Sequence, residues 1–432
     1  MAKSKKQKAD PSVKHTIVTL RSEPAAIAQQ MSVDRVHSVV RAAENGQTRD
    51  LFTLYRDVIT TDSHLQTELA KRKLAVLGDQ MSVMPWDKKS PSDVTAATAI
   101  EEMIHNCRSW KAACIHLFDS VLWPVSVVEK VFSSRSTSSN PYGSQPRSFY
   151  LSELAIVPHY LLDYSTGSMR INDVDPISGT ILSTSREVDP DRYIVHRGHL
   201  LSSPDNWGGP MRSILFWWLL STQGREWWAR FLDRYGSPFI VAKHAKGDDH
   251  SRGVLRAALA LSVKLGGLVV SDETMIELVQ ASSAQSGDAY DKFITVCQRE
   301  KSKLILGQTL SAEAQPTGLG SGVSGMQESV RQDIRAWDGE SLSETLRLEL
   351  FSQYLQINGI IATTPNLTWG SVSPAEMKAR ADLLVAFSQA GIRPTQNALA
   401  NLSEETGIEL EFNPTPPGVG APRPFLSSYS AR

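Results

Sequence analysis

The sequence predicts an α+β fold that is predominantly helical. Apolar residues recur at helical spacing over most of the chain, whereas β-branched and alternating stretches are short and gather between residues 125 and 199. With 432 residues, 41% of them apolar and 21% charged, the chain is long enough for one large or two ordinary domains with a substantial core.

The N-terminal half is predicted to form helices followed by short strands. Residues 1–25 are expected to be a flexible arm. No secretion signal is predicted, because no apolar stretch follows the lysines of residues 1–10. Asp62 has the position and side chain of an N-cap. Helices are predicted at Ala25–Asn45, Thr48–Thr60, Asp62–Leu77, Ser92–Asn106 and Ser109–Leu122. Strands are predicted at Met81–Trp86, at Val125–Phe132 and in short pieces from Phe149 to His199, with a loop at Ser133–Gln145.

The C-terminal half is predicted to be mainly helical. A strong helix follows Gly208-Gly209-Pro210 and runs to about Tyr235. The longest helical pattern is Met326–Asn358, where the capping-box pair Ser341 and Glu344 predicts a kink or restart at 339–341. Further helices are predicted at Asp248–Lys264, Ala289–Leu306, Pro374–Ala390 and Thr395–Thr406, and strands at Phe239–Lys243, Gly267–Ser271, Thr274–Gln280 and Leu367–Trp369. The proline-rich residues 413–432 are predicted to be extended.

The helix at 210–235 is apolar on several sides of its first half. At 100° per residue, Trp217 and Trp228 share one face, while Trp218 and Trp227 project to opposite flanks. Such a helix must be covered on more than one side. Two interpretations stay open: a central helix in a large core, or a helix packed between neighbouring subunits of a ring.

Motifs typical of catalytic or cofactor sites are either absent or lack the neighbouring residues that such sites require. Gly320, Gly322 and Gly325 spell GxGxxG, but no strand precedes them, so a dinucleotide site is not predicted. His196 and His199 lack a third metal ligand nearby. The sequence contains neither a G-x-S-x-G elbow nor a phosphate-binding G-x-x-x-x-G-K-[ST] loop. We therefore expect no catalytic residue, no metal, no cofactor and no enzymatic activity.

Charge and hydropathy limit the possible partners. The net charge of −1 excludes a protein coated in basic surface, so contact with nucleic acid must be local or weak. The most apolar window, Ile214–Leu220, is far too short to span a bilayer, and no membrane partner is expected. Cys107, Cys114 and Cys297 have no metal-ligand spacing and are predicted to be reduced core residues, as in a cytoplasm. Residues 308–325 contain no lysine or arginine.

Four stretches, taken in order, resemble the portal proteins of tailed bacteriophages, most closely the Mu-like portal subgroup. The first is Asp62–Leu77, and the second is Asp119–Phe132 with Glu129. The third is Gly208–Lys246, with Arg-Tyr-Gly-Ser-Pro-Phe at 234–239. The fourth is Ile305–Leu310, with the Gly/Ser-rich segment and the long helix behind it. Together the resemblance spans residues 30–400.

The resemblance implies a ring of about twelve subunits with wing, stem, clip and crown regions. The wing would be residues 26–207 with 326–370, the stem helices 208–236 and 285–307, the clip 237–284, the tunnel loop 308–325 and the crown 371–412. Subunit contacts would involve Trp217, Trp218, Trp227, Trp228 and Arg225 of the stem. The DNA-channel loop would present Gln308, Thr309, Ser311, Gln315, Thr317, Ser321 and Ser324. The clip would present Lys243, His244, Lys246 and Asp248 to docking proteins.

The implied function is the channel for genome packaging and ejection at one capsid vertex of the virion, after assembly in the host cytoplasm. The implied partners are copies of the same chain, double-stranded DNA in transit, the large terminase subunit, head-completion adaptors, the major capsid protein and the scaffold. Two alternatives stay open. One is a nucleic-acid-processing enzyme, which would need clustered carboxylates or a phosphate-binding loop; the other is a capsid or tail-completion protein without a DNA channel.

Overall fold

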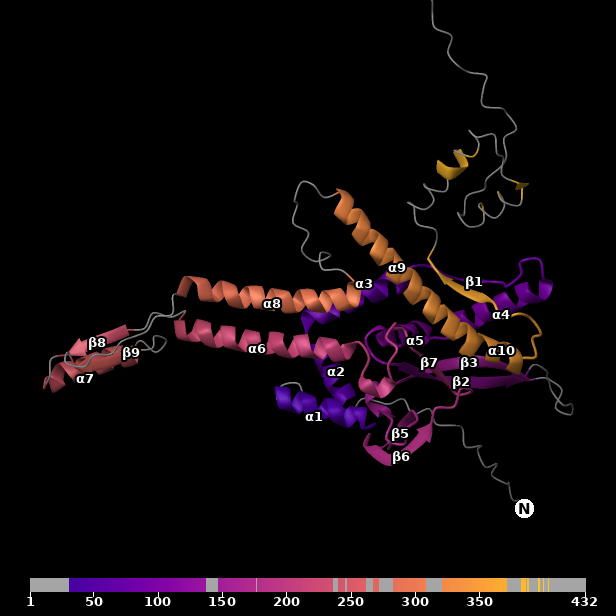
Figure 1. Ribbon diagram of the computed structural model, residues 1–432. Helices are drawn as coiled ribbons and strands as arrows, with labels where there is room; N and C mark the ends of the chain where they lie inside the picture. Colours follow the sequence, from indigo (N-terminus) through magenta and orange to yellow (C-terminus); the bar gives the residue numbers. More distant parts are fainter. Residues whose placement is uncertain are drawn as a thin grey trace, which may run out of the picture. The chain divides into compact units, whose positions relative to one another are not determined.

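The structure is a computed structural model (Figure 1). It describes residues 31–136, 147–175, 177–235, 240–244, 247–261, 267–271, 283–307 and 321–370, together with a few residues between 382 and 403. The described part is mostly helical with several small sheets, which confirms the predicted class. The chain divides into two units after Thr368, and few residues of the second unit are described.

Three helices open the described chain: α1 (Val33–Glu44), α2 (Arg49–Thr61) and α3 (Ser63–Leu77). The α1 helix begins later than predicted, because Ser32 is extended and its hydroxyl accepts a hydrogen bond from the Arg35 amide. Residues 25–30 lie outside the described residues. Asp62 caps α3 as predicted: its carboxylate accepts hydrogen bonds from the amides of His64 and Leu65, at 3.0 and 3.1 Å.

A three-stranded antiparallel sheet forms the centre of the larger unit. Its middle strand β2 (Ser126–Ser136) lies between β3 (Arg147–Val157) and β7 (Tyr193–His196). The loop predicted at Ser133–Gln145 is wrong at its start, because Ser133 and Ser134 continue the ladder opposite Tyr150 and Phe149. The helices α4 (Pro91–Asn106) and α5 (Trp110–Leu117) contact this sheet. Fully buried large side chains include Phe52, Tyr55, Phe118, Leu122 and Tyr193.

Two smaller sheets flank this centre. The strands β4 (Leu162–Asp163), β5 (Arg170–Val174) and β6 (Ile181–Glu187) form an antiparallel meander. The strand β1 (Met81–Met84) pairs with β10 (Asn366–Trp369), far away in sequence. Both strands were predicted from the sequence, but their pairing was not. Short 3₁₀ turns occupy Phe118–Val121, His159–Leu161 and Asp205–Trp207.

A pair of long helices, α6 (Met211–Tyr235) and α8 (Ser283–Leu306), lies side by side (Figure 1). Between them in sequence stand β8 (Ile240–His244), α7 (Asp249–Leu261) and β9 (Gly267–Ser271). The two strands pair in parallel, Ile240 opposite Gly267, and α7 supplies the crossover that a parallel pair requires. The strand predicted at Thr274–Gln280 lies outside the described residues.

The long C-terminal helix differs from its prediction at two places. The α9 helix (Ser321–Leu346) includes Gly322 and Gly325, which were predicted as loop; a glycine costs about 1 kcal/mol in a helix, which a 26-residue helix tolerates. The restart predicted at 339–341 is wrong, because α9 continues through these residues to Leu346, and the Ser343 and Thr345 hydroxyls donate to the carbonyls of Gly339 and Ser341 within the helix. The irregularity is instead a π-helical turn at Arg347–Phe351, followed by α10 (Ser352–Ile357).

None of the helices in the described ranges is long and apolar enough to cross a membrane.

Gly208, just ahead of α6, is expected to resist substitution. Its φ is +92°, and a Cβ added there would lie 2.3 Å from the Tyr55 hydroxyl oxygen. Left-handed strain and overpacking together predict that Gly208→Ala destabilises the fold by about 2–4 kcal/mol. Gly167 is the control, with φ +85° and nothing within 4 Å of the added Cβ. Gly167→Ala should cost about 1–2 kcal/mol, from left-handed strain alone. Urea unfolding midpoints compare the two, and equal losses would contradict the packing argument.

Candidate functional site

The paired helices α6 and α8 pack closely through small and aromatic residues. A Cβ added at Gly224 of α6 would lie 3.0 Å from the Phe293 ring of α8. The Phe231 and Tyr290 rings meet with centroids 5.7 Å apart. Trp217 and Trp228, which share the face of α6 toward these contacts, are half-buried. One side of α6 is thus covered by α8 of the same chain.

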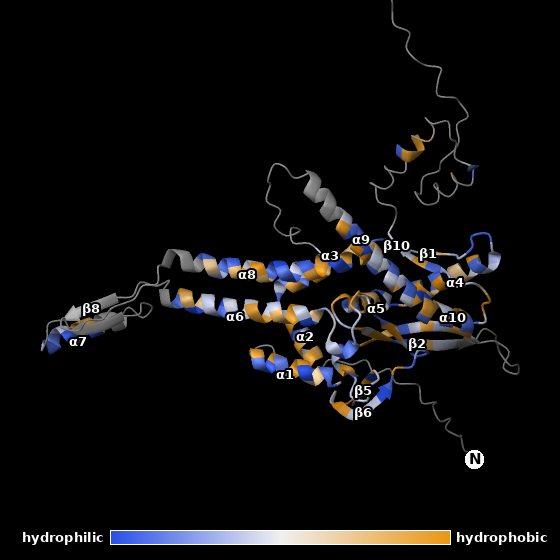
Figure 2. Cartoon of the chain, in the orientation of Figure 1, coloured by the Kyte–Doolittle hydropathy of each residue, from blue (hydrophilic) through white to orange (hydrophobic). Residues whose placement is uncertain are grey.

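The other tryptophans of α6 lie on opposite flanks, as the helical spacing predicted. Trp218 is only 5% exposed, beside the buried Ile214 and Leu219, so it offers nothing to a neighbouring copy. Trp227 is 48% exposed and Phe216, eleven positions earlier, is 57% exposed. At 100° per residue these two lie on one stripe. Figure 2 shows apolar residues recurring along α6. We call Phe216 and Trp227 the α6 stripe.

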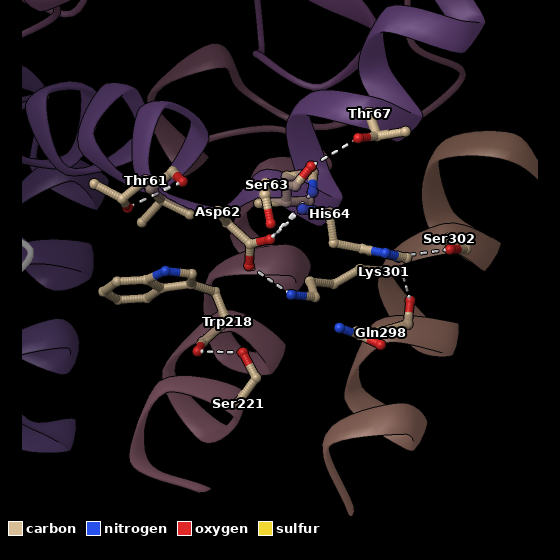
Figure 3. Close-up of polar contacts among 12 residues, drawn as sticks. Thr61, Asp62, Ser63, His64, Thr67, Trp218, Ser221, Gln298, Lys301 and Ser302 are labelled. Atoms are coloured by element: carbon tan, nitrogen blue, oxygen red, sulfur yellow. Dashed lines mark hydrogen bonds and ion pairs between the residues drawn. The ribbon is translucent and has the colours of Figure 1, made fainter. Parts of the chain in front are cut away.

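The base of α8 is held by a buried ion pair with Asp62. The Lys301 ammonium lies 2.5 Å from the Asp62 carboxylate, and both side chains are buried (Figure 3). Burial raises the pKa of Asp62, but Lys301 and the backbone amide of Leu65 lower it by more, and the net shift of the pKa is downward. One carboxylate therefore caps α3 and neutralises a lysine of α8.

His64 adds a second contact between α3 and α8. Its Nε2 lies 2.8 Å from the Ser302 hydroxyl oxygen and 3.0 Å from the Gln298 carbonyl oxygen (Figure 3). Burial and the nearby Lys301 charge lower the pKa of His64. A neutral ring with its proton on Nε2 can donate to the carbonyl, which suits a fixed structural contact.

Arg72 connects α3 to both α8 and α9. Its Nε and Nη2 bond the two carboxylate oxygens of Asp338 at 2.8 and 2.9 Å, in a bidentate pair. Its Nη1 donates to the Ile305 carbonyl at 2.7 Å, satisfying an oxygen of the last turn of α8. Arg335 of α9 in turn pairs with Asp79 and donates to the Ala75 carbonyl. We call these contacts of Asp62, His64, Arg72 and Asp79 the α3 junction.

The π-helical turn after α9 is anchored on the central sheet. The buried Lys130 of β2 donates to the Glu349 carbonyl and to the Pro190 carbonyl, each at 2.7 Å. The Glu349 carboxylate accepts from the Val195 amide at 2.7 Å. Burial lowers the pKa of Lys130 to about 8. The helix thus deforms where its backbone bonds the sheet.

One buried cluster holds a serine and a histidine within hydrogen-bonding distance. The Ser126 hydroxyl lies 3.0 Å from His159 Nε2, whose ring stacks on Trp123 with centroids 3.8 Å apart. The pKa of His159 is lowered, first by burial and then by His116. Ser126 and His159 are both buried in the core. Within the described ranges, no three His, Cys, Asp or Glu side chains could together hold a metal ion.

The other predicted residues have ordinary structural partners. His196 Nδ1 lies 2.9 Å from the Thr345 hydroxyl oxygen, and His199 Nε2 lies 2.9 Å from the Pro124 carbonyl oxygen. The three cysteines are free and buried, as predicted. Asp248 accepts bonds from the Ser251 amide and hydroxyl at the start of α7. Lys243 and His244 belong to β8.

Only some of the predicted channel and clip residues belong to the described part of the chain. Gln308, Thr309, Ser311, Gln315, Thr317 and Lys246 lie outside the described residues. Ser321 and Ser324 belong to the first turns of α9 and not to a loop. Arg225 is exposed on α6 and its charge acts on the Asp62–Lys301 pair.

Sequence reasoning missed Phe216 and the ion pairs of the α3 junction. The one usable signal for Phe216 was its eleven-residue spacing from Trp227, which places both on one face. No local pattern pairs Arg72 with Asp338 or Asp62 with Lys301, because each pair joins helices more than 200 residues apart.

Comparison with known proteins gives a consistent family. The protein-family model described as the portal protein of Mu bacteriophage matches residues 52–408 of this chain. The chain is 23% identical to the portal protein of Escherichia phage Mu, over 83% of this chain and 68% of that protein. It is also 23% identical to the Mu-like prophage FluMu protein gp29 of Haemophilus influenzae, over 87% of this chain and 72% of that protein. A chain of the native gene transfer agent virion aligns with a TM-score of 0.49 and 10% identity, covering 81% of this chain and 93% of that chain.

The family model covers most of the chain, including the paired helices α6 and α8, and this places the chain in the class of phage portal proteins. The chain belongs to the family of the portal protein of Mu bacteriophage. The resemblance noted in the sequence is thereby confirmed.

Proposed function

We propose that this chain forms a ring of about twelve copies at one capsid vertex of a virion, around a channel for packaging and ejecting DNA. The large terminase subunit and then the head-completion adaptors would dock on the clip, residues 237–284. The observation that carries the proposal is membership of the portal family together with the exposed α6 stripe on a helix pair already closed on its other side by α8.

The α3 junction supports a channel role for the segment between α8 and α9. That segment, residues 308–320, joins two helices that are each tied to α3 by ion pairs. The absence of lysine and arginine from it suits passage of DNA, because each phosphate contact adds affinity that would retard sliding.

Native mass measurement of the purified full chain tests the ring. We expect one species of about twelve chains, with a central opening in low-resolution images. A stable monomer or dimer at every concentration would contradict the proposal and favour a processing enzyme. A ring with no opening wide enough for duplex DNA would favour a capsid or tail-completion protein.

Adding positive charge to the proposed channel segment should impede DNA passage. We expect Gln315→Lys with Thr317→Lys to retain DNA more tightly and to lower the amount packaged per particle. The salt dependence of binding should steepen by about 0.9 in log K against log salt for each new phosphate contact. Packaging assays and DNA binding at several salt concentrations measure both effects.

The matched control places the same two charges on an exposed strand elsewhere. Ser183 and Thr184 of β6 are exposed, and their replacement by lysine should leave packaging near the wild-type level. Equal behaviour of the two lysine pairs would argue against a channel position for residues 315 and 317.

A further inference from the structure

A closed ring built from one kind of contact needs two different faces on each chain, because the contact is heterologous. The α6 stripe can supply only one of them. A second face that suits the α6 stripe would be apolar and exposed and would carry charges of the opposite sign.

The α9 helix and the π-helical turn that follows it carry such a face, here called the α9 stripe. Trp337 is 46% exposed and Leu348 is 55% exposed, although both are large apolar side chains. Trp337 lies in α9 and Leu348 in the π-helical turn that continues it, three turns further along. Phe216 and Trp227 have the same spacing on α6. Each stripe thus presents two large apolar side chains about three helical turns apart.

Charge differs between the two stripes in a complementary way. Asp333, Glu340 and Glu344 line one flank of the α9 stripe, all exposed, and none has an ion-pair partner in the described part of the chain. Arg212 and Arg230 flank the α6 stripe four positions before Phe216 and three after Trp227. Their own partners, Glu44 and Glu226, form surface pairs worth about 0–1 kcal/mol, which an approaching carboxylate can replace.

We propose that the α9 stripe of one copy, Trp337 and Leu348 with Glu344 between them, packs on the α6 stripe of the next copy, with Arg230 facing its acidic flank. The proposal rests on the ring function proposed above and names the two faces that build it. An α6-to-α6 contact would be isologous and would close as a dimer, so it cannot propagate a ring.

Cysteine crosslinking in the full chain tests this pairing. The double variant Trp227→Cys, Trp337→Cys, treated with a short bismaleimide, should give a ladder of covalent multimers on a denaturing gel. Neither single variant should give even a covalent dimer, because the pairing joins residue 227 of one copy to residue 337 of the next and the native cysteines are buried. If the double variant does not assemble, Gln223→Cys with Ser341→Cys places the thiols on the same stripes without removing a tryptophan.

The outcomes separate this inference from the proposed function. A covalent dimer from Trp227→Cys alone would overturn the α6–α9 pairing in favour of α6–α6 contact. Wild-type rings by native mass together with no ladder from either double variant would overturn the pairing and leave the ring standing. Wild-type chains that never assemble would overturn both.

A charge exchange gives an independent check. We expect Arg230→Glu and Glu344→Arg each to lower the fraction of assembled chains several-fold and the double exchange to restore most of it. Ala336→Glu, exposed on α9 but off the stripe, should leave assembly unchanged. A double exchange no better than the singles would place Glu344 away from Arg230 and contradict the pairing.

Discussion

Replacing Lys301 by methionine is expected to destabilise the folded chain by about 3–5 kcal/mol. The variant leaves the Asp62 carboxylate buried without its counter-ion, and removing one partner of a buried pair costs far more than the pair itself contributes. The same carboxylate caps α3, so the loss acts on α3 and α8 together. Urea unfolding of wild type and variant at equal protein concentration measures the difference.

Two further variants isolate the buried charge as the cause. Lys303, two positions away, pairs with Glu300 on the exposed side of α8, and Lys303→Met should cost less than about 1 kcal/mol. The double variant Asp62→Asn, Lys301→Met removes both charges and keeps a good N-cap residue, so it should recover most of the loss. A double variant as unstable as Lys301→Met alone would show that lost packing, and not the unpaired carboxylate, causes the effect.

The pH dependence of these variants has a defined sign. In the wild type the pKa of Asp62 is lowered on folding, so the stabilisation it provides is present above its unfolded value of about 3.9 and is lost as pH falls through the folded value. In Lys301→Met, burial without the lysine should raise the Asp62 pKa above the unfolded value. The destabilisation should therefore be greatest near pH 7 and shrink toward pH 5. A constant difference across this range would contradict an ionised Asp62.

The sequence predicted most helices because their signals are local. The carboxylate of Asp62 caps α3 as its position indicated, and the stretch from Gly208 to Pro210 does precede α6. The parallel pair β8 and β9 with α7 between them also agrees with the pattern of short strands around a helix. Such features depend on a few neighbouring residues and need no knowledge of the rest of the chain.

The errors fall where distant residues determine the local structure. Ser341 and Glu344 have the spacing of a capping box, but Arg72 of α3 holds Asp338 just before them, and the helix runs straight through. In the π-helical turn at 347–351, the Glu349 carbonyl accepts a hydrogen bond from Lys130 of β2. These two residues are 219 positions apart, so no local sequence pattern could predict the contact. Residues 133–136 were predicted as loop, but they form strand because the backbone of β3 pairs with them.

The candidate site was predicted only in part, because helical spacing is a local property whereas burial depends on distant residues. Helical spacing placed Trp218 and Trp227 on opposite flanks, and the structure agrees. Spacing alone could not say which flank the rest of the chain covers. Burial decides this: Trp218 belongs to the core, and Phe216 joins Trp227 on the exposed stripe.

Replacing Trp227 by glutamate is expected to abolish ring assembly while leaving the subunit folded. Trp227 is a large, half-exposed aromatic side chain, the residue type that dominates interface energetics, and truncating such a residue costs at least about 2 kcal/mol per contact. That is a factor of about 30 in affinity at each contact, and a buried charge adds to it. Native mass measurement should show mainly monomers, and far-ultraviolet circular dichroism should match the wild type.

The control for this variant is Ala229→Glu, which adds the same charge two positions away on an exposed part of α6 outside the stripe. We expect it to assemble like the wild type, because nothing in the proposed contact involves that face. Trp218→Glu should behave differently from both: it places a charge in the core, so it should unfold the subunit and not merely disperse the ring. Full assembly of Trp227→Glu would remove the α6 stripe from the subunit interface, whatever the ring's stoichiometry.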